Sequence, residues 1–166
     1  LPIELGDDYD GLIVPALTTD LIIDGNLNDW GTLLFVADQV VYGSSVWNDN
    51  VDLSATYGIA WDDLYLYVAV EVRDDVHVQT EVGETIFKGD SVEILFDREI
   101  DSDALVRKLN SDDYQIGLSP GSFTDTSILA QVYRWYPVAQ SGTITDSKIE
   151  SRSNEGGYLI EAALPW

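Results

Sequence analysis

The stretch that decides the fold is Ile59–Asp75, which reads IAWDDLYLYVAVEVRDD. Leucine or valine occupies every second position from Leu64 to Val72, so these side chains share one face of an extended strand. The positions between them are also largely apolar as far as Ala69. A strand that is apolar on both faces is covered on both sides, so this pattern predicts a central strand.

The alternation recurs in Phe87–Asp97, FKGDSVEILFD, where valine, isoleucine and phenylalanine alternate with polar residues and one leucine. Similar patterns predict further strands at residues 21–23, 54–61, 114–118, 127–138, 143–151 and 157–164, with 143–151 as an edge strand. Short strands at close spacing, without a long helix, are typical of an all-β antiparallel β-sandwich of jelly-roll type. We expect a single domain over residues 1–166, with residues 1–19 as a leader that packs on its edge.

The composition excludes several classes of partner and site. Thirty acidic residues against eight basic ones give a formal net charge of −22. This charge argues against nucleic acid and against an anionic membrane surface. The chain has no cysteine, so disulfides and cysteine-based metal sites are ruled out. No apolar run approaches the length that membrane insertion requires.

Two acidic patterns are candidates for a calcium site, because calcium binds six to eight oxygen ligands. One pattern has an acid at every second position: Asp97, Glu99, Asp101 and Asp103. The other begins with Asp24 and Asn26, and neither pattern is an EF-hand. Asp74, Asp75 and Asp90 are further candidate ligands. The alternative for all of these residues is a solvated turn, with Asp24 and Asn26 capping a turn through side-chain hydrogen bonds.

Four ordered segments together resemble one known family. They are IDGNLNDW (Ile23–Trp30), AWDDLYLYVAVEVRDD (Ala60–Asp75), GDSVEILFD (Gly89–Asp97) and GGYLIEAALPW (Gly156–Trp166). They look like the family 9 carbohydrate-binding modules, and the resemblance spans roughly residues 20 to 166. It implies a non-catalytic, calcium-containing β-sandwich of secreted bacterial proteins that grips the end of a sugar chain between aromatic rings.

The resemblance also implies individual site residues. Phe87 matches the first ring platform of the family, and Glu93 matches the glutamate that binds sugar hydroxyls. Gln115 matches a family glutamine, while Gly117 stands where the family often has arginine. The family's second ring follows its terminal Pro-Trp motif, and here the chain stops at Trp166. This difference suggests an incomplete sandwich whose final strands are absent or supplied by another chain.

Aromatic residues outside the core pattern add to the candidate site. Trp47 and Trp135 are candidates because a sugar ring packs its C–H face on an aromatic face while nearby acids and amides bind its hydroxyl groups. The alternative for each is ordinary core or edge packing.

We therefore expect a calcium-stabilised module, secreted or at the cell surface, that binds a polysaccharide or oligosaccharide and is not an enzyme. His77 is the only histidine, and no nucleophile motif such as G-x-S-x-G is present. The alternative is a structural subunit of a surface layer or filament that self-assembles through the same sandwich. A haem-binding domain is disfavoured, because the chain has no methionine to serve as an axial ligand.

Overall fold

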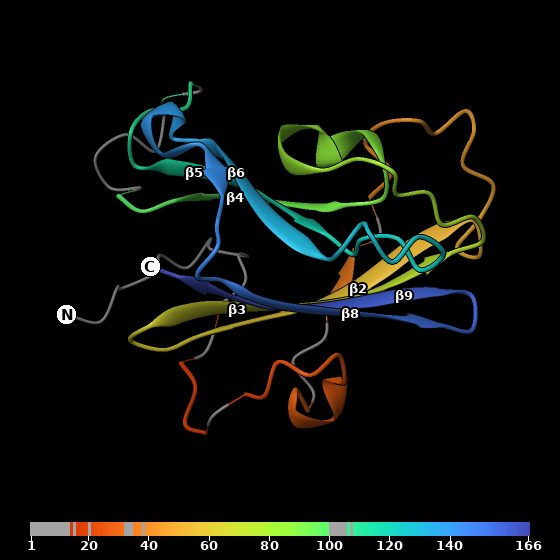
Figure 1. Ribbon diagram of the computed structural model, residues 1–166, viewed down its shortest axis with the longest axis horizontal. Coiled ribbons are helices and arrows are strands. Elements are labelled where there is room, and N and C mark those ends of the chain that lie inside the picture. Colours follow the sequence, from red (N-terminus) through yellow and green to blue (C-terminus); the bar gives the residue numbers. More distant parts are fainter. Residues whose placement is uncertain are drawn as a thin grey trace, which may run out of the picture.

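The computed structural model describes residues 14, 16–19, 21–31, 35–37, 39–99, 106 and 108–166. Its strands form two antiparallel sheets that pack face to face (Figure 1). Sheet A has the strand order β1-β2-β3-β9-β8, and sheet B has the order β4-β5-β6-β7. The predicted all-β antiparallel sandwich is confirmed.

Sheet A consists of β1 (Phe35–Ala37), β2 (Leu53–Trp61), β3 (Tyr65–Asp74), β8 (Lys148–Asn154) and β9 (Gly157–Pro165). Sheet B consists of β4 (Val92–Asp97), β5 (Asp113–Ser119), β6 (Gln131–Tyr136) and β7 (Gly142–Thr143). The described chain also contains the short 3₁₀ helices η1 (Leu27–Asp29), η2 (Gly83–Lys88) and η3 (Val138–Gln140). Within the described ranges, no helix has the length and apolar character needed to span a bilayer.

The strand β3 is central, as its alternation predicts. It lies between β2 and β9, and Ala69 is paired with Gly58 on one side and Glu161 on the other. The side chains of Val68 and Val70 point into the space between the sheets and are buried there.

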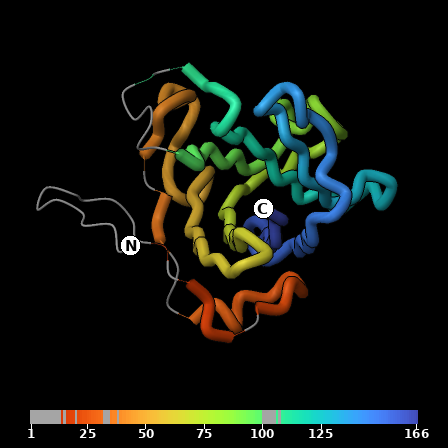
Figure 2. Tube along the Cα trace, turned by 90° about the vertical axis from the view of Figure 1, so that its left-hand side faces the viewer, coloured from red at the N-terminus to blue at the C-terminus, as the bar shows by residue number. Residues whose placement is uncertain are grey.

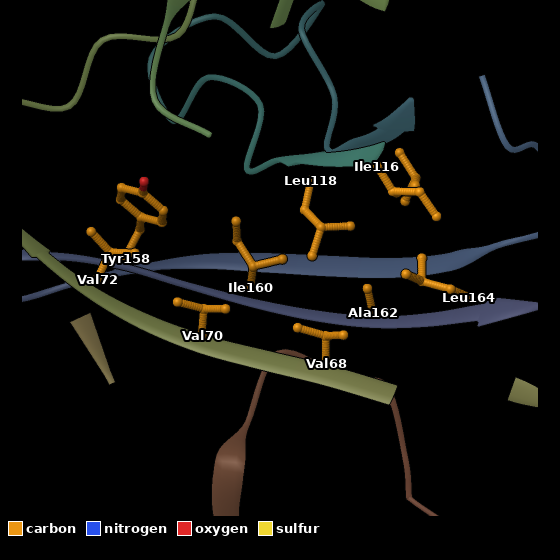
Figure 3. Packing of buried hydrophobic residues seen from close by; sticks show 10 residues of the cluster. Val68, Val70, Val72, Ile116, Leu118, Tyr158, Ile160, Ala162 and Leu164 are labelled. Carbon is orange, nitrogen blue, oxygen red and sulfur yellow. The ribbon is translucent and has the colours of Figure 1, made fainter. Parts of the chain in front are cut away.

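The main core fills the space between the two sheets. Figure 3 shows side chains from β3 and β9 pointing toward Ile116 and Leu118 on β5 of sheet B. Ile160 and Leu118 are fully buried, each with 0% of its surface exposed. Burial of such apolar side chains on both sheets holds the two layers together.

A second core covers the opposite, outer face of sheet A. Its fully or nearly buried members are Trp30, Ala60, Tyr67, Ala69 and Ala163. The described residues between 16 and 31 form a third layer against this face (Figure 2). The odd-numbered face of β3 is therefore apolar as far as Ala69 because that part of it is also buried.

The prediction of a strand at residues 21–23 is wrong. Leu21 and Ile23 instead pack their side chains on the second core, while Ile22 is 65% exposed. The Ile22 backbone N–H donates to Asp29 Oδ2 at 2.8 Å rather than to a neighbouring strand. The period-two pattern here reflects one-sided packing of an irregular segment.

The prediction of one edge strand over residues 143–151 is also wrong. β7 pairs with β6 in sheet B, whereas β8 pairs with β9 in sheet A. Between them the chain turns at Ile144, whose carbonyl oxygen accepts hydrogen bonds from the N–H and the hydroxyl of Ser147. Ile144 packs against the main core, so the alternation continues while the chain changes sheets.

Two further segments differ in extent from the prediction. The strand expected at 127–138 is shortened to β6, because Asp125 accepts hydrogen bonds from Ser127 and closes a turn before it. In the leader, the structure describes only residues 14 and 16–19. There, Ala16 forms a parallel bridge with Trp61 at the end of β2.

Candidate functional site

The exposed ring of Phe87 is carried by η2, which packs on the outer face of sheet B. Phe87 is 53% exposed, while its neighbour Ile86 is fully buried and anchors the helix. Gly83, the first residue of η2, has a φ of 62°, in the left-handed region that favours glycine. The local fold thus buries Ile86 and presents the next ring to solvent.

A buried amide holds the ends of this turn in place. Gln79 is 2% exposed, and its Nε2 donates to the carbonyl oxygens of Ile86 at 3.1 Å and Asp90 at 2.8 Å. Its Oε1 accepts a hydrogen bond from the Glu81 N–H at 2.9 Å. Gly89 leaves the space that the Gln79 side chain occupies. These hydrogen bonds therefore fix the backbone of the turn that carries Phe87.

Trp135 on β6 forms a wall beside Phe87. The two ring centroids are 6.1 Å apart and the planes meet at 74°, an edge-on arrangement. The Trp135 indole N–H donates to the Glu84 carbonyl oxygen at 2.9 Å, so it already has a protein partner. Tyr133 on the same strand lies 5.4 Å from Trp135, centroid to centroid. The three rings make a continuous aromatic group.

The Trp135 ring lies directly over Gly117 on β5. A Cβ added at Gly117 would overlap the Cη2 and Cζ3 atoms of Trp135 and would touch Ile86 as well. No larger side chain can therefore stand at position 117 while Trp135 keeps this place. The glycine that replaces the expected arginine is explained by the indole ring above it.

An acid and an amide lie next to these rings. Gln115 Nε2 donates to Glu93 Oε2 at 2.9 Å across β4 and β5. Glu93 is exposed, and its partner across the strands is Gly117, the residue beneath the Trp135 ring. The structure thus brings together four of the five predicted sugar-binding residues: Phe87, Glu93, Gln115 and Trp135.

This arrangement suits a polyhydroxylated, uncharged ligand. An aromatic face packs against apolar C–H groups, and a carboxylate accepts hydrogen bonds from hydroxyl groups. The Gln115 amide also has an oxygen that can accept and a nitrogen that can donate. A sugar ring carries both kinds of group, because it has apolar C–H groups on its face and hydroxyl groups at its edge.

Trp47 is not part of this group. Its indole N–H donates to the Leu53 carbonyl oxygen at 2.8 Å, which closes the loop before β2. Among the described rings, no contact joins Trp47 to Phe87 or Trp135. Trp47 therefore has a local structural role in the described part of the chain.

Three of the predicted calcium ligands, Asn26, Asp74 and Asp97, accept hydrogen bonds within local turns. Asp97 accepts a hydrogen bond from the Glu99 N–H at 2.7 Å, and Asn26 accepts one from the Asn28 N–H at 3.2 Å. The Asn26 contact is the predicted cap, and it begins η1. The backbone N–H of Asp24 donates to Glu161 Oε2, and the side chain of Asp75 is exposed. Asp101 and Asp103 lie outside the described residues.

No group of three or more acidic or histidine side chains in the described ranges is placed to hold a metal ion. Asp74 and Asp90 are nevertheless neighbours. Burial raises the pKa of the Asp90 carboxyl group, and Asp74 adds to the rise, while a 2.6 Å hydrogen bond from the Val78 N–H opposes it. The described residues thus offer a carboxylate pair but not a complete calcium site.

His77 connects this acid pair to the next loop. Its Nδ1 lies 2.9 Å from Asp90 Oδ2, although the contact lacks hydrogen-bond geometry. Its Nε2 lies 3.0 Å from the Gly121 carbonyl oxygen, to which a protonated Nε2 donates. The ring also packs against Phe123 and Tyr158. His77 therefore links its own segment to the segment that contains Asp90 and to the loop that contains Gly121 and Phe123.

Two important residues are absent from the predicted set. The alternation of β6 alone does not show that the Tyr133 ring lies beside Trp135, so the sequence does not identify Tyr133 as a site residue. Glu161 is fully buried, and its only signal is an acid inside the otherwise apolar run of β9.

Glu161 ties the segment 24–30 to the last strand. Its Oε2 accepts hydrogen bonds from the backbone N–H groups of Asp24 at 3.0 Å, Gly25 at 2.6 Å and Asn26 at 3.0 Å. Its Oε1 accepts a 2.7 Å hydrogen bond from the Trp30 indole. One carboxylate therefore joins the motif at 23–30 to the motif at 156–166 and holds the layer that covers sheet A.

Comparison with known proteins agrees with this architecture. The chain is 28% identical over 160 residues to exoglucanase XynX of Acetivibrio thermocellus, which covers 93% of this chain and 12% of that protein. It is 25% identical over 155 residues to endo-1,4-beta-xylanase A of Thermotoga maritima, covering 87% of this chain and 12% of that protein. The chain thus spans only about an eighth of the length of these curated relatives.

Solved structures show the same fold. A family 9 carbohydrate-binding module from Caldicellulosiruptor kristjanssonii in complex with cellotriose has a TM-score of 0.62 and 22% identity, covering 92% of this chain and 66% of that one. A module from the same organism in complex with glucose has a TM-score of 0.58 and 21% identity, covering 92% and 68%. A model of the carbohydrate family 9 binding domain-like family matches residues 23–166. The chain belongs to the carbohydrate family 9 binding domain-like family.

Proposed function

We propose that this chain is a non-catalytic module that binds a neutral oligosaccharide or polysaccharide on the outer face of sheet B. The observation that supports it is the continuous group formed by Phe87, Trp135, Glu93 and Gln115. Rings for the C–H faces of a sugar and an acid–amide pair for its hydroxyl groups lie side by side. The structurally similar modules in complex with cellotriose and glucose make cellotriose the first ligand to test.

The experiment is calorimetric titration with cellotriose. Phe87→Ala is expected to weaken binding roughly tenfold or more, because it removes an exposed aromatic anchor. Glu93→Ala is expected to weaken it similarly by removing the hydroxyl acceptor. Neither change is expected to unfold the chain, because both side chains are exposed.

Two matched variants make this test specific. Tyr42 is 98% exposed and lies outside the group, so Tyr42→Ala removes an equally accessible ring and should leave binding unchanged. Trp47→Ala should also leave it unchanged. Equal binding by Phe87→Ala and the parent protein, with the fold intact, would contradict the proposal.

We also propose that calcium stabilises the fold, as the family resemblance implies. The Asp74–Asp90 pair supports this, because an ion beside two close carboxylates would offset their repulsion. Backbone carbonyl groups and water would have to complete its shell. Chelation is then expected to lower the melting temperature, since an ion that binds only the folded state stabilises it. An unchanged melting curve in the presence of chelator would rule calcium out.

Secretion or display at the cell surface, as a part of a larger protein, fits a glycan-binding module and is part of the same proposal. The self-assembling structural subunit, and a second chain that completes the sandwich, stay predictions from the sequence.

A further inference from the structure

A hollow lies on the outer face of sheet A, whereas the residues Phe87, Trp135, Glu93 and Gln115, here called the Phe87 group, lie on sheet B. It has a volume of about 390 Å³. Its lining includes Val36 on β1, Thr56 on β2, Glu71 and Arg73 on β3, and Asn154 on β8. Small-molecule sites in proteins are concave and typically about 300–1,000 Å³ in volume, so this hollow has the size of a ligand site.

The strand alternation explains why this region is open. Glu71 and Arg73 share the face of β3 that carries Tyr67 and Ala69, but they lie beyond the second core that buries those two residues. In Figure 1 the segment containing η1 lies beneath the middle of sheet A, and the β8–β9 hairpin extends past it. The end of the face is therefore uncovered by the described chain.

The lining offers free donors and a positioned acceptor. The Arg73 side chain makes no ion pair or hydrogen bond with a described residue, so its guanidinium donors are available. Asn154 Nδ2 donates to Glu71 Oε1 at 3.3 Å, which holds the acid in place across β9. Val36 is 65% exposed and supplies an apolar wall.

From these groups we propose that the hollow is a second saccharide site, for one or two units of a neutral glycan. A sugar hydroxyl can donate to Glu71 and accept from Arg73, and the C–H groups of the ring can lie against Val36. An anionic ligand is disfavoured, because Glu155 also lines the hollow and the chain carries a net charge of −22.

Two sites on the outer faces of opposite sheets would make the module bivalent. Because one module could then contact two glycan chains, its retention on insoluble polysaccharide would exceed the affinity of either site alone. Only the choice of a saccharide as ligand rests on the proposed function, since the hollow shares no residue with the Phe87 group.

The test is a two-dimensional amide NMR titration of the full chain with cellotriose, xylotriose and mannotriose. Binding at the hollow is expected to shift the amides of residues 71–73 and 154–156, and to continue doing so in the Phe87→Ala protein. Arg73→Ala is expected to weaken this second response roughly tenfold. Lys148→Ala, which removes a cation from the same face outside the hollow, should leave it unchanged.

The outcomes separate the two proposals. Shifts confined to residues 86–93 and 115–117 would overturn the second site and leave the proposed function standing. Shifts confined to the hollow would support the second site and contradict the role of Phe87. No shift at the hollow with any of the three trisaccharides would overturn this inference.

Discussion

The outer faces of the two sheets differ in what covers them. On sheet A, the middle of the face is apolar and lies under the segment that contains Trp30. On sheet B, β4 alternates inward apolar residues with the exposed residues Glu93 and Leu95. The same sandwich therefore uses the middle of one outer face for a second core and leaves the strand β4 of the other face accessible. The comparison teaches that a strand apolar on both faces marks a covered layer, and a strand with strict alternation marks an accessible one.

The largest expected effect comes from removing the cover of sheet A. Glu161→Ala leaves three backbone N–H groups and the Trp30 indole without their acceptor. We expect the free energy of unfolding to fall by about 3 kcal/mol or more, because buried donors lose a charged partner. Urea denaturation followed by circular dichroism measures this change.

A neighbouring acid provides the control. Glu150 is the partner of Glu161 across β8 and β9, but it is exposed. Glu150→Ala should change stability by less than about 0.5 kcal/mol. Equal losses for the two variants would show that the cover does not depend on the buried carboxylate.

A smaller effect is expected on the accessible face. Gly117→Ala places a methyl group against the Trp135 ring and should cost about 1–3 kcal/mol through overpacking. The displaced ring should also weaken cellotriose binding. Adding Trp135→Leu should restore stability but not binding, and a Gly117→Ala protein identical to the parent in both measurements would contradict the packing that we describe.

The smallest effect concerns Tyr158, on the inner face that the two sheets share. Burial raises the pKa of Tyr158, and Asp90 and Asp74 add to the rise. Above about pH 10 the unfolded chain releases this proton while the folded chain keeps it. The unfolded state then binds fewer protons, so the stability present below pH 10 declines as the pH increases.

The Tyr158→Phe protein isolates that contribution. It should lose less stability than the parent protein between pH 9 and pH 11, as followed by urea denaturation at each pH. Tyr42→Phe serves as the control, because Tyr42 is 98% exposed. Parallel losses in all three proteins would mean that Tyr158 does not contribute to alkaline sensitivity.

The sequence predicts what depends on local pattern. The central position of β3 and the two faces of β4 follow from alternation alone, and both are confirmed. The same signal fails at residues 143–151, because Ile144 keeps its inward direction while the chain moves from sheet B to sheet A. Period-two alternation identifies which side chains are buried but not the sheet to which the strand belongs.

The candidate site is predictable to a similar degree. Phe87, Glu93 and Gln115 could be named because the family resemblance implies them. The roles of Trp47 and Trp135 could not be told apart from the sequence. The alternation of the strands does not show that the Trp47 indole bonds the Leu53 carbonyl oxygen or that the Trp135 ring lies over Gly117. Glu161 was missed because a buried acid is recognised only when its donors, 131 to 137 positions earlier in the chain, are seen around it.

The fully engaged amide of Gln79 has a consequence for the thermodynamics of recognition. All of its described hydrogen bonds go to the backbone of the turn that bears Phe87, and these contacts hold the turn in place without a ligand. A ligand then immobilises few additional degrees of freedom, and little of its interaction energy is consumed in ordering the receptor. Complex formation should accordingly proceed as docking to a rigid surface, with nearly the same backbone in the free and occupied protein.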